Sequence, residues 1–325
     1  MLRIAVAILF ALGVAGAPLS AQQQPSLPSA LAELRAQDAR VLTLGYRLGT
    51  GNARYCSDTT FTAGLLLHDM APYEDGSSLQ RILGLAGDIG VQALVEGGPA
   101  QSAGLQVDDT VIAIGTTQVA DVPLEKGKPW TRIEAIRAES ERLLDETGSL
   151  PITVLRDNAP VQIEIAGVPA CRSRFEIGED SRAVADGHRV VIGSKFAGID
   201  YADPLLAAAL AHELSHNLLR HRAWFDANGG RKRKSVRLTE READRLSAWL
   251  LANAGFDPQA GVAFFSKWGP AHGGWIFRKR SHDGWDERVE FIEAEIARME
   301  ALASTDWSQH FIKENLPGKT AVPGR

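Results

Sequence analysis

Apolar residues at the start of the chain form one unbroken stretch. It runs from Ile4 to Ala17 and follows the positively charged start Met1-Leu2-Arg3. This arrangement is typical of a secretory signal peptide, here with a cleavage point near Ala21. A membrane anchor is the alternative, but it needs roughly 20 apolar residues in a row. We therefore expect residues 1–21 to be a signal peptide and the protein to be exported, to a bacterial periplasm or the medium, without a transmembrane span.

The next region, residues 22–75, shows the period of a helix. Its apolar positions share one helical side: Leu31, Leu34, Val41, Leu42 and Leu48. Such a stripe predicts a helix that packs on another domain. We expect it to rest on the C-terminal half, because an oxidising compartment would permit a disulfide between Cys56, just after this helix, and Cys171. Two buried free thiols are the alternative.

Between the two cysteines the period changes to that of strands. Apolar residues alternate from residue 91 to 95 and recur from 111 to 114, with glycines and Pro99 in between. A helix is predicted after Pro129. The chain then alternates on both sides of Asp157-Asn158, which predicts a hairpin. One interpretation is a generic small α+β domain without a ligand.

The segment "GGPAQSAGLQVDD" and this order of elements resemble a bacterial-type PDZ domain over residues 76–168. Asp108-Asp109 stands where the family usually has Gly-Asp. The resemblance implies a PDZ-like β-sandwich or barrel whose open sheet edge adds a peptide strand, often with the peptide C-terminus held by a loop of backbone amides. The best candidate for that loop is Leu83 to Ile89.

Polar residues interrupt an apolar helix in the C-terminal half. Asp203 is suited to cap this helix and Pro204 to its first position, and every residue from Leu205 to Ala211 is apolar, so the helix is predicted to be buried. His212 and His216 then lie about 40° apart on one face. Glu213 lies beside them.

Two imidazoles and a carboxylate on a buried helix need a compensating partner, and a metal ion supplies one. The alternative is an ordinary polar face. The pattern H-E-x-x-H is the zinc-protease signature, with His212 and His216 as ligands and Glu213 as the base. His221 is about 140° further round the same helix and is expected to face elsewhere. Leu219 and Arg222 exclude the metzincin pattern, which needs Gly and His there.

The third zinc ligand is predicted from the next helix, "LTEREADRLSAWLLANAG", which Gly255 ends. Glu240 and Asp244 are four residues apart and share a face, whereas Glu242 points to roughly the opposite side. We assign Glu240 to the metal and Asp244 to a supporting position, where it orients one histidine. A solvent-facing acid near the helix N-terminus is the alternative for Glu240.

H-E-x-x-H followed by E-x-x-A-D resembles the HtpX-like and CAAX prenyl endopeptidase family of gluzincin zinc metallopeptidases, over residues 169–325. The resemblance implies an α+β fold: a mainly helical zincin-type domain with a small hairpin, whose edge strand near Val190 to Ser194 binds substrate. In "SHDGWDERVEFI", it places His282 near the scissile carbonyl as a catalytic residue and pairs Arg288 with Asp244. Asp283 stands where the family usually has Pro, and a surface role for His282 is the alternative.

These resemblances together imply a zinc-dependent endopeptidase of the cell envelope that carries one Zn²⁺ per chain. Glu213 would take a proton from water at the ion and pass it to the leaving amine. The expected substrates are extended or misfolded polypeptides, which the PDZ-like domain recruits or gates. One alternative is a catalytically silent, zinc-holding chaperone or scaffold that acts through the PDZ-like domain. Another is a hydrolase of a non-peptide amide.

The composition narrows the choice of partners. The chain has 325 residues, of which 45% are hydrophobic, enough for two globular domains. Its formal net charge of -5 gives no reason to expect a nucleic-acid partner. The basic run Arg231 to Lys234 has two interpretations: contact with anionic lipid at a membrane surface, or a solvated loop, which we favour.

Overall fold

The computed structural model describes residues 27–272, 283–314 and 316. The expected signal peptide and His282 lie outside these residues. The α-helices are α1 (Leu27–Asn52), α2 (Gly76–Leu83), α3 (Pro99–Ser102), α4 (Thr131–Thr147), α5 (Asp203–Leu218), α6 (His221–Ala227), α7 (Arg233–Asn253), α8 (Gln259–His272), α9 (Trp285–Leu302) and α10 (Trp307–His310). Short 3₁₀ helices are η1 (Ala53–Tyr55) and η2 (Val119–Asp121).

The strands are β1 (Thr59–Thr62), β2 (Leu65–Asp69), β3 (Ile89–Leu94), β4 (Thr110–Ile114), β5 (Thr117–Gln118), β6 (Ser149–Arg156), β7 (Ala159–Ala166), β8 (Val168–Cys171), β9 (Arg174–Gly178), β10 (Ala183–Ala185) and β11 (Arg189–Gly193). The chain therefore has an α+β fold. None of its described helices combines the length and the apolar character that a membrane crossing requires.

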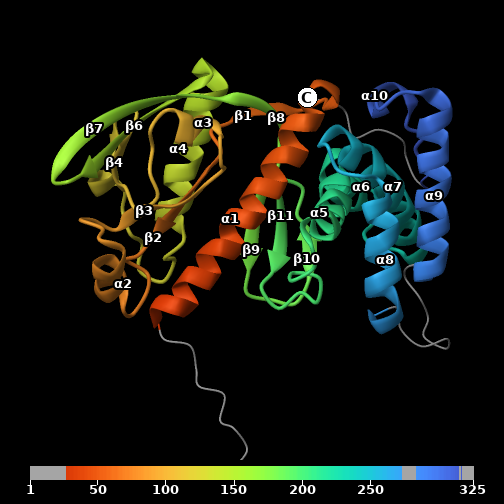
Figure 1. Cartoon of the computed structure of the whole chain (residues 1–325), viewed down its shortest axis with the longest axis horizontal. Helices are drawn as coiled ribbons and strands as arrows, with labels where there is room; N and C mark the ends of the chain where they lie inside the picture. Colours follow the sequence, from red (N-terminus) through yellow and green to blue (C-terminus); the bar gives the residue numbers. More distant parts are fainter. Residues whose placement is uncertain (1–26, 273–282, 315, 317–325) are drawn as a thin grey trace, which may run out of the picture.

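The long helix α1 lies between two parts of the molecule (Figure 1). One side of it packs into the core of the C-terminal helices through Val41, Leu44 and Leu48. The other side of α1 faces the sheets. There Arg35 Nη2 of α1 donates a hydrogen bond to Asp108 at 2.8 Å, and Gln92 of β3 donates one to Asp38 of α1 at 3.0 Å. The expected packing of this helix on the C-terminal half is thus present, and the helix also contacts the intervening domain.

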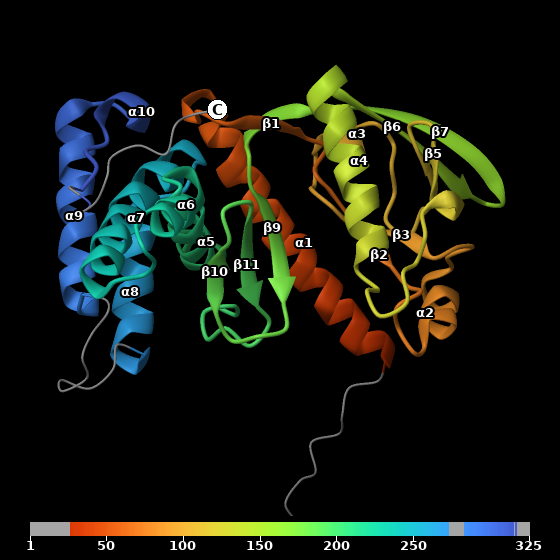
Figure 2. The ribbon, with the colours of Figure 1, turned by 180° about the vertical axis from the view of Figure 1, so that it is seen from behind.

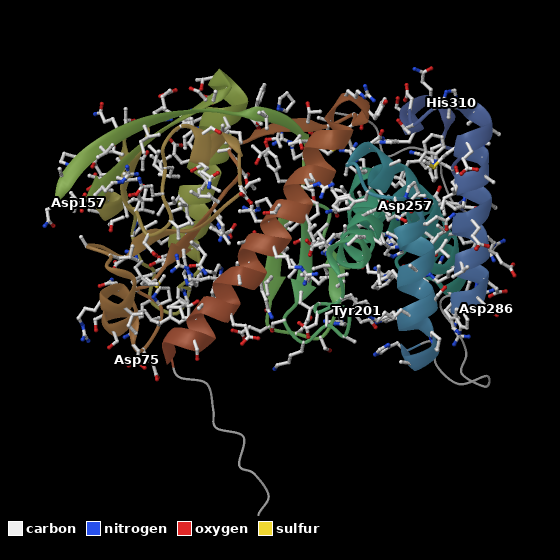
Figure 3. All side chains as sticks on the ribbon, viewed as in Figure 1. Asp75, Asp157, Tyr201, Asp257, Asp286 and His310 are labelled. Carbon is white, nitrogen blue, oxygen red and sulfur yellow. A yellow bond between two sulfur atoms is a disulfide. The ribbon has the colours of Figure 1, made fainter. Side chains whose placement is uncertain are left out.

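The intervening part, residues 59–171, is here called the inserted unit. Its larger sheet has the order β2-β3-β4-β6-β7, and β5 pairs with β4. Figure 2 shows α4 in front of this sheet. The predicted hairpin is present: β6 and β7 pair along their whole length, and Asp157 and Asn158 both have positive φ, as a type I′ turn requires. Asp157 lies at the outer tip of the unit (Figure 3).

The inserted unit is attached to the rest of the molecule through a short stem. In this stem β1 pairs with β8 in the antiparallel sense, from Thr59 opposite Cys171 to Thr62 opposite Val168. The disulfide between Cys56 and Cys171 closes the stem, as expected, with their Cα atoms 5.5 Å apart. The large sheet begins at β2, before the expected boundary at residue 76. Residues 65–67 are three consecutive leucines, so the period of two that marks a half-buried strand is hidden there.

The remainder, residues 172–314, is called the helical half. Its small sheet has the order β10-β11-β9; β11 runs parallel to β9 and antiparallel to β10. The prediction that the segment near Val190 to Ser194 is an edge strand is therefore wrong. Strand β11 is the central strand, and β10 lies at the edge beyond it. Strand β11 is central because β9 pairs with it in the parallel sense on the side away from β10, and no hairpin pattern in the sequence indicates such a pairing.

Candidate metal centre

Helix α5 places the H-E-x-x-H residues inside the helical half. Every residue from Leu206 to Ala211 is buried, so the apolar run fixes this helix in the core. The helix begins at Asp203, but the side chain of Asp203 does not cap it. That carboxylate instead accepts a hydrogen bond of 2.6 Å from Arg40 of α1. His212 and His216 emerge from this fixed helix towards α7, which packs against α5.

Three side chains bring their ligand atoms together here. His212 Nε2 lies 3.3 Å from His216 Nε2 and 3.4 Å from Glu240 Oε2, and His216 Nε2 lies 3.6 Å from Glu240 Oε1. Zinc bonds of about 2.0–2.1 Å in a tetrahedral site place neighbouring ligand atoms about 3.3–3.4 Å apart. The buried group of His212, His216 and Glu240 therefore has the spacing that a metal ion of this size needs.

The outer nitrogen of His212 has its own partner. Its Nδ1 lies 2.9 Å from Asp244 Oδ1, so a proton on Nδ1 leaves Nε2 free to bind a metal. Asp244 is held in turn by the guanidinium of Arg288, which donates to both carboxylate oxygens at 2.6 and 2.7 Å. Arg288 also lies 3.9 Å above the ring of Phe265. The pairing expected between Arg288 and Asp244 is present.

The outer nitrogen of His216 lies within hydrogen-bond distance of His221, a residue that helical spacing predicts to face elsewhere. His216 Nδ1 lies 2.7 Å from His221 Nδ1, and His221 Nε2 lies 2.9 Å from Glu242 Oε2. Helix α5 ends at Leu218, and Arg220 adopts the left-handed conformation with φ 59° before α6 begins. The helical angle of about 140° therefore does not apply to His221. A non-glycine residue in this conformation gives no signal in the sequence.

The charged side chains around the ligand group favour the binding of a cation. Glu213, Glu240 and Asp244 surround the site, and the guanidinium of Arg288 interacts with all three. When the histidines are neutral, as metal binding requires, three carboxylates and one guanidinium leave two negative charges in a poorly solvated space. A divalent cation would neutralise them.

Glu213 has the properties of a base next to this group. It is partly buried, and burial raises the pKa of its carboxyl to about 7. Within the described ranges, Glu213 forms no hydrogen bond or ion pair with another side chain. Its carboxylate is thus available for a proton at a pKa close to neutral pH.

The histidines differ in their affinity for a proton. Burial opposes the charged form of His212, but hydrogen bonds to Asp244 and Glu240 outweigh it and raise the pKa of His212 to about 10. Burial lowers the pKa of His216 well below its usual range and that of His221 to about 3. Burial also raises the pKa of Glu242 to about 7, while the backbone N–H of Glu314 acts in the opposite direction. In the metal-free site His212 therefore carries the proton.

Asp283, which stands where the resembled family usually has Pro, has a structural contact. Its carboxylate accepts hydrogen bonds from Arg241 at 2.6 and 3.2 Å and lies 3.1 Å from Arg237 Nε. Both arginines belong to α7. Asp283 thus ties the segment before α9 to the helix that carries Glu240.

A cavity of about 730 Å³ lies between the inserted unit and the helical half. Its walls include β2 and α4 on one side and α1 and β9 on the other. Strand β2, at one edge of the large sheet, lines this cavity. The expected carboxylate loop, Leu83 to Ile89, leads into the internal strand β3 and is not part of the lining of this cavity. Residues 61–63, which precede β2, also line it.

Comparisons with known proteins give little further information. No protein-family model matches the sequence, and no curated protein matches it either. A solved structure of the PDZ domain of HtrA3, bound to a phage-derived ligand (FGRWV), is similar to part of the chain at 18% identity and a TM-score of 0.25. It covers 34% of this chain and 88% of that domain. The functional assignment therefore depends on the geometry of the site.

Proposed function

We propose that this protein is a zinc-dependent endopeptidase of the cell envelope that cleaves extended or misfolded polypeptides. The observation that carries the proposal is the triangle of ligand atoms from His212, His216 and Glu240, with Glu213 beside it. Two histidines, one carboxylate and an adjacent glutamate are the set that zinc peptidases use.

The side chains divide the chemistry between them. Zinc bound by the three ligands supplies a Lewis acid that polarises a peptide carbonyl and makes water acidic. Glu213 accepts the proton of the attacking water and returns it to the leaving amine. Asp244 and Arg288 hold the ring of His212, so that its Nε2 keeps its direction.

The edge strand β10 is the proposed binding site for the substrate backbone. It pairs with β11 on one side only and packs against α5, the helix that carries the site. The side chain of Val184, in its middle, is 37% exposed. A strand that offers main-chain hydrogen bonds selects extended chains more than particular side chains, which fits a substrate class of unfolded polypeptides.

The inserted unit would recruit or gate these substrates. The cavity beside β2 is large enough for a few residues of an extended peptide, and it opens between the unit and the helical half. Ion pairs join the two walls: Arg174 of β9 lies 3.1 Å from Glu134 and 3.4 Å from Glu141 of α4. The Cys56–Cys171 disulfide fits an oxidising compartment such as the periplasm.

The proposal is tested by incubating the purified protein with unfolded casein. Wild-type protein with zinc should cleave it, and a chelator should stop cleavage. Glu213→Gln should lower the rate by a factor of about 10² to 10⁴ and should retain zinc, because Glu213 is not a ligand. His310→Gln serves as a control, since His310 lies outside the ligand group and outside the cavity beside β2 and should leave the rate unchanged.

Zinc-bound wild-type protein that leaves casein and other unfolded chains intact would contradict the endopeptidase proposal. If that protein still suppressed aggregation of an unfolded chain, the result would favour the zinc-holding chaperone. Cleavage that persists in Glu213→Gln at the wild-type rate would show that another group is the base.

A further inference from the structure

The metal site is supported by a second layer of side chains that reaches the C-terminal segment. From the ligand His216, contacts continue to His221, then to Glu242, and then to the backbone of Glu314. The hydrogen-bond distances are 2.7 Å from His216 Nδ1 to His221 Nδ1, 2.9 Å from His221 Nε2 to Glu242 Oε2, and 2.7 Å from Glu314 N to Glu242 Oε1. His221 is 2% exposed and Glu242 is 1% exposed, so water does not compete for these bonds.

The protons in this series can be placed in order. His216 faces the other ligand atoms with Nε2, so as a ligand it carries its proton on Nδ1. That proton is donated to His221 Nδ1, which leaves the proton of His221 on Nε2. Glu242 accepts it, because a carboxylate has only acceptor atoms. Its second oxygen accepts the backbone N–H of Glu314. Each donor thus has one acceptor.

The last member of the series belongs to the segment Phe311–Glu314, which follows His310 at the end of α10 (Figure 3). Arg245 of α7 holds this segment: it donates to the carbonyl of Ile312 at 2.9 Å and lies 3.0 Å from the Glu314 carboxylate. Arg245 is itself bound to Glu295 of α9 at 2.8 Å. The segment is therefore fixed across α7 on the side opposite to Glu240.

We propose that His221 and Glu242 are positioning residues of the metal site, and that the segment Phe311–Glu314 completes this support. They hold the His216 ring in place and keep its proton on Nδ1, so that Nε2 is available to the metal. This inference rests on the proposed zinc site and concerns the affinity of that site. His212 has the corresponding support from Asp244 directly, whereas His216 receives it through an additional imidazole.

The test measures zinc affinity by competition with a chromophoric chelator at pH 8, on the full-length protein. Loss of a hydrogen-bond partner behind a metal-bound histidine weakens metal binding about 10- to 100-fold. We expect this loss for His221→Leu and for Glu242→Gln, whose single amide oxygen cannot accept from both His221 and Glu314. Cobalt bound in place of zinc should show a changed visible spectrum in both variants, which a general loss of stability would not produce.

The contribution of the C-terminal segment is tested by a matched pair of variants. Glu314→Pro removes the backbone N–H that Glu242 accepts, and Glu314→Ala removes only the side chain. Zinc affinity should fall in Glu314→Pro relative to Glu314→Ala. The thermal midpoint of each metal-free variant shows whether it is folded.

Two results separate the possible failures. If wild-type protein and all four variants bind zinc with equal affinity and give the same cobalt spectrum, the positioning role is wrong and the zinc site stands. If wild-type protein binds no zinc, the proposed function fails as well. Equal affinities for Glu314→Pro and Glu314→Ala would overturn the role of the segment.

Discussion

His212 is the residue whose protonation opposes metal binding most directly. Its contacts with Asp244 and Glu240 raise its pKa to about 10, so below that pH the metal-free site holds a proton that zinc must displace. Zinc binding should therefore release about one proton, and affinity should rise about tenfold per pH unit from pH 7.5 to 9. Titration calorimetry in two buffers with different ionisation enthalpies measures the protons released.

Asp244→Asn is the variant that tests the cause of this pH dependence. The amide cannot attract the His212 proton as the carboxylate does, so the pKa of His212 should fall and fewer protons should be released. Binding heats that are the same in both buffers for wild-type protein would show that His212 is neutral before zinc arrives.

The sequence predicted the inner part of this site better than the outer part. His212, His216, Glu240 and Asp244 follow from helical spacing, because each pair lies one turn apart on a regular helix. His221 could not be placed in this way, since the left-handed residue Arg220 ends one helix and redirects the chain.

The supporting role of Glu242 could not be predicted from the sequence for a different reason. It does point away from Glu240, but α7 is buried on both sides, between α5 and the segment Phe311–Glu314. A polar residue on the second side of a helix is normally taken as exposed. Only the three-dimensional structure shows that this side is covered.

At the level of elements, the close packing of α1 makes a specific prediction about its glycines. A Cβ on Gly51 would lie 2.5 Å from the carbonyl oxygen of Asn253 and 2.9 Å from Ala254 Cα, both backbone atoms of the α7 end. Gly51→Ala should therefore lower the free energy of unfolding by about 1–3 kcal/mol. A Cβ on Gly49 would meet Ala170 Cβ at an ordinary 3.5 Å.

Gly49→Ala is thus the matched control in the same helix. It should leave stability unchanged or raise it by up to about 1 kcal/mol, because alanine favours helix more than glycine. Urea unfolding followed by tryptophan fluorescence compares the two variants. Equal effects would show that α1 does not pack closely on the end of α7.

The elements that the sequence predicted least well are those of the small sheet. Strand β11, which was predicted at the edge, is central because β9 pairs with it on the side away from β10. The alternation of residues 174–178 is weak, and all five are only partly buried. Parallel pairing depends on segments that are distant in sequence, so its register cannot be derived from a local pattern.

For the whole molecule, the disulfide is the covalent bond that controls the inserted unit. Cys56 and Cys171 are 115 residues apart, and closing a loop of that length restricts the unfolded chain strongly. Replacing both cysteines with serine should lower the free energy of unfolding by about 2–5 kcal/mol. A reducing agent should have the same effect on wild-type protein and none on the variant. Unfolding of wild-type protein that is insensitive to reduction would contradict this role.

A crystallographic anomalous difference map at the zinc absorption edge can show whether His212, His216 and Glu240 hold one zinc ion. We expect a single strong peak about 2.0–2.2 Å from His212 Nε2, His216 Nε2 and a carboxylate oxygen of Glu240. A zinc-soaked crystal with no peak between these residues, or with its peak elsewhere in the chain, would show that they do not form the zinc site.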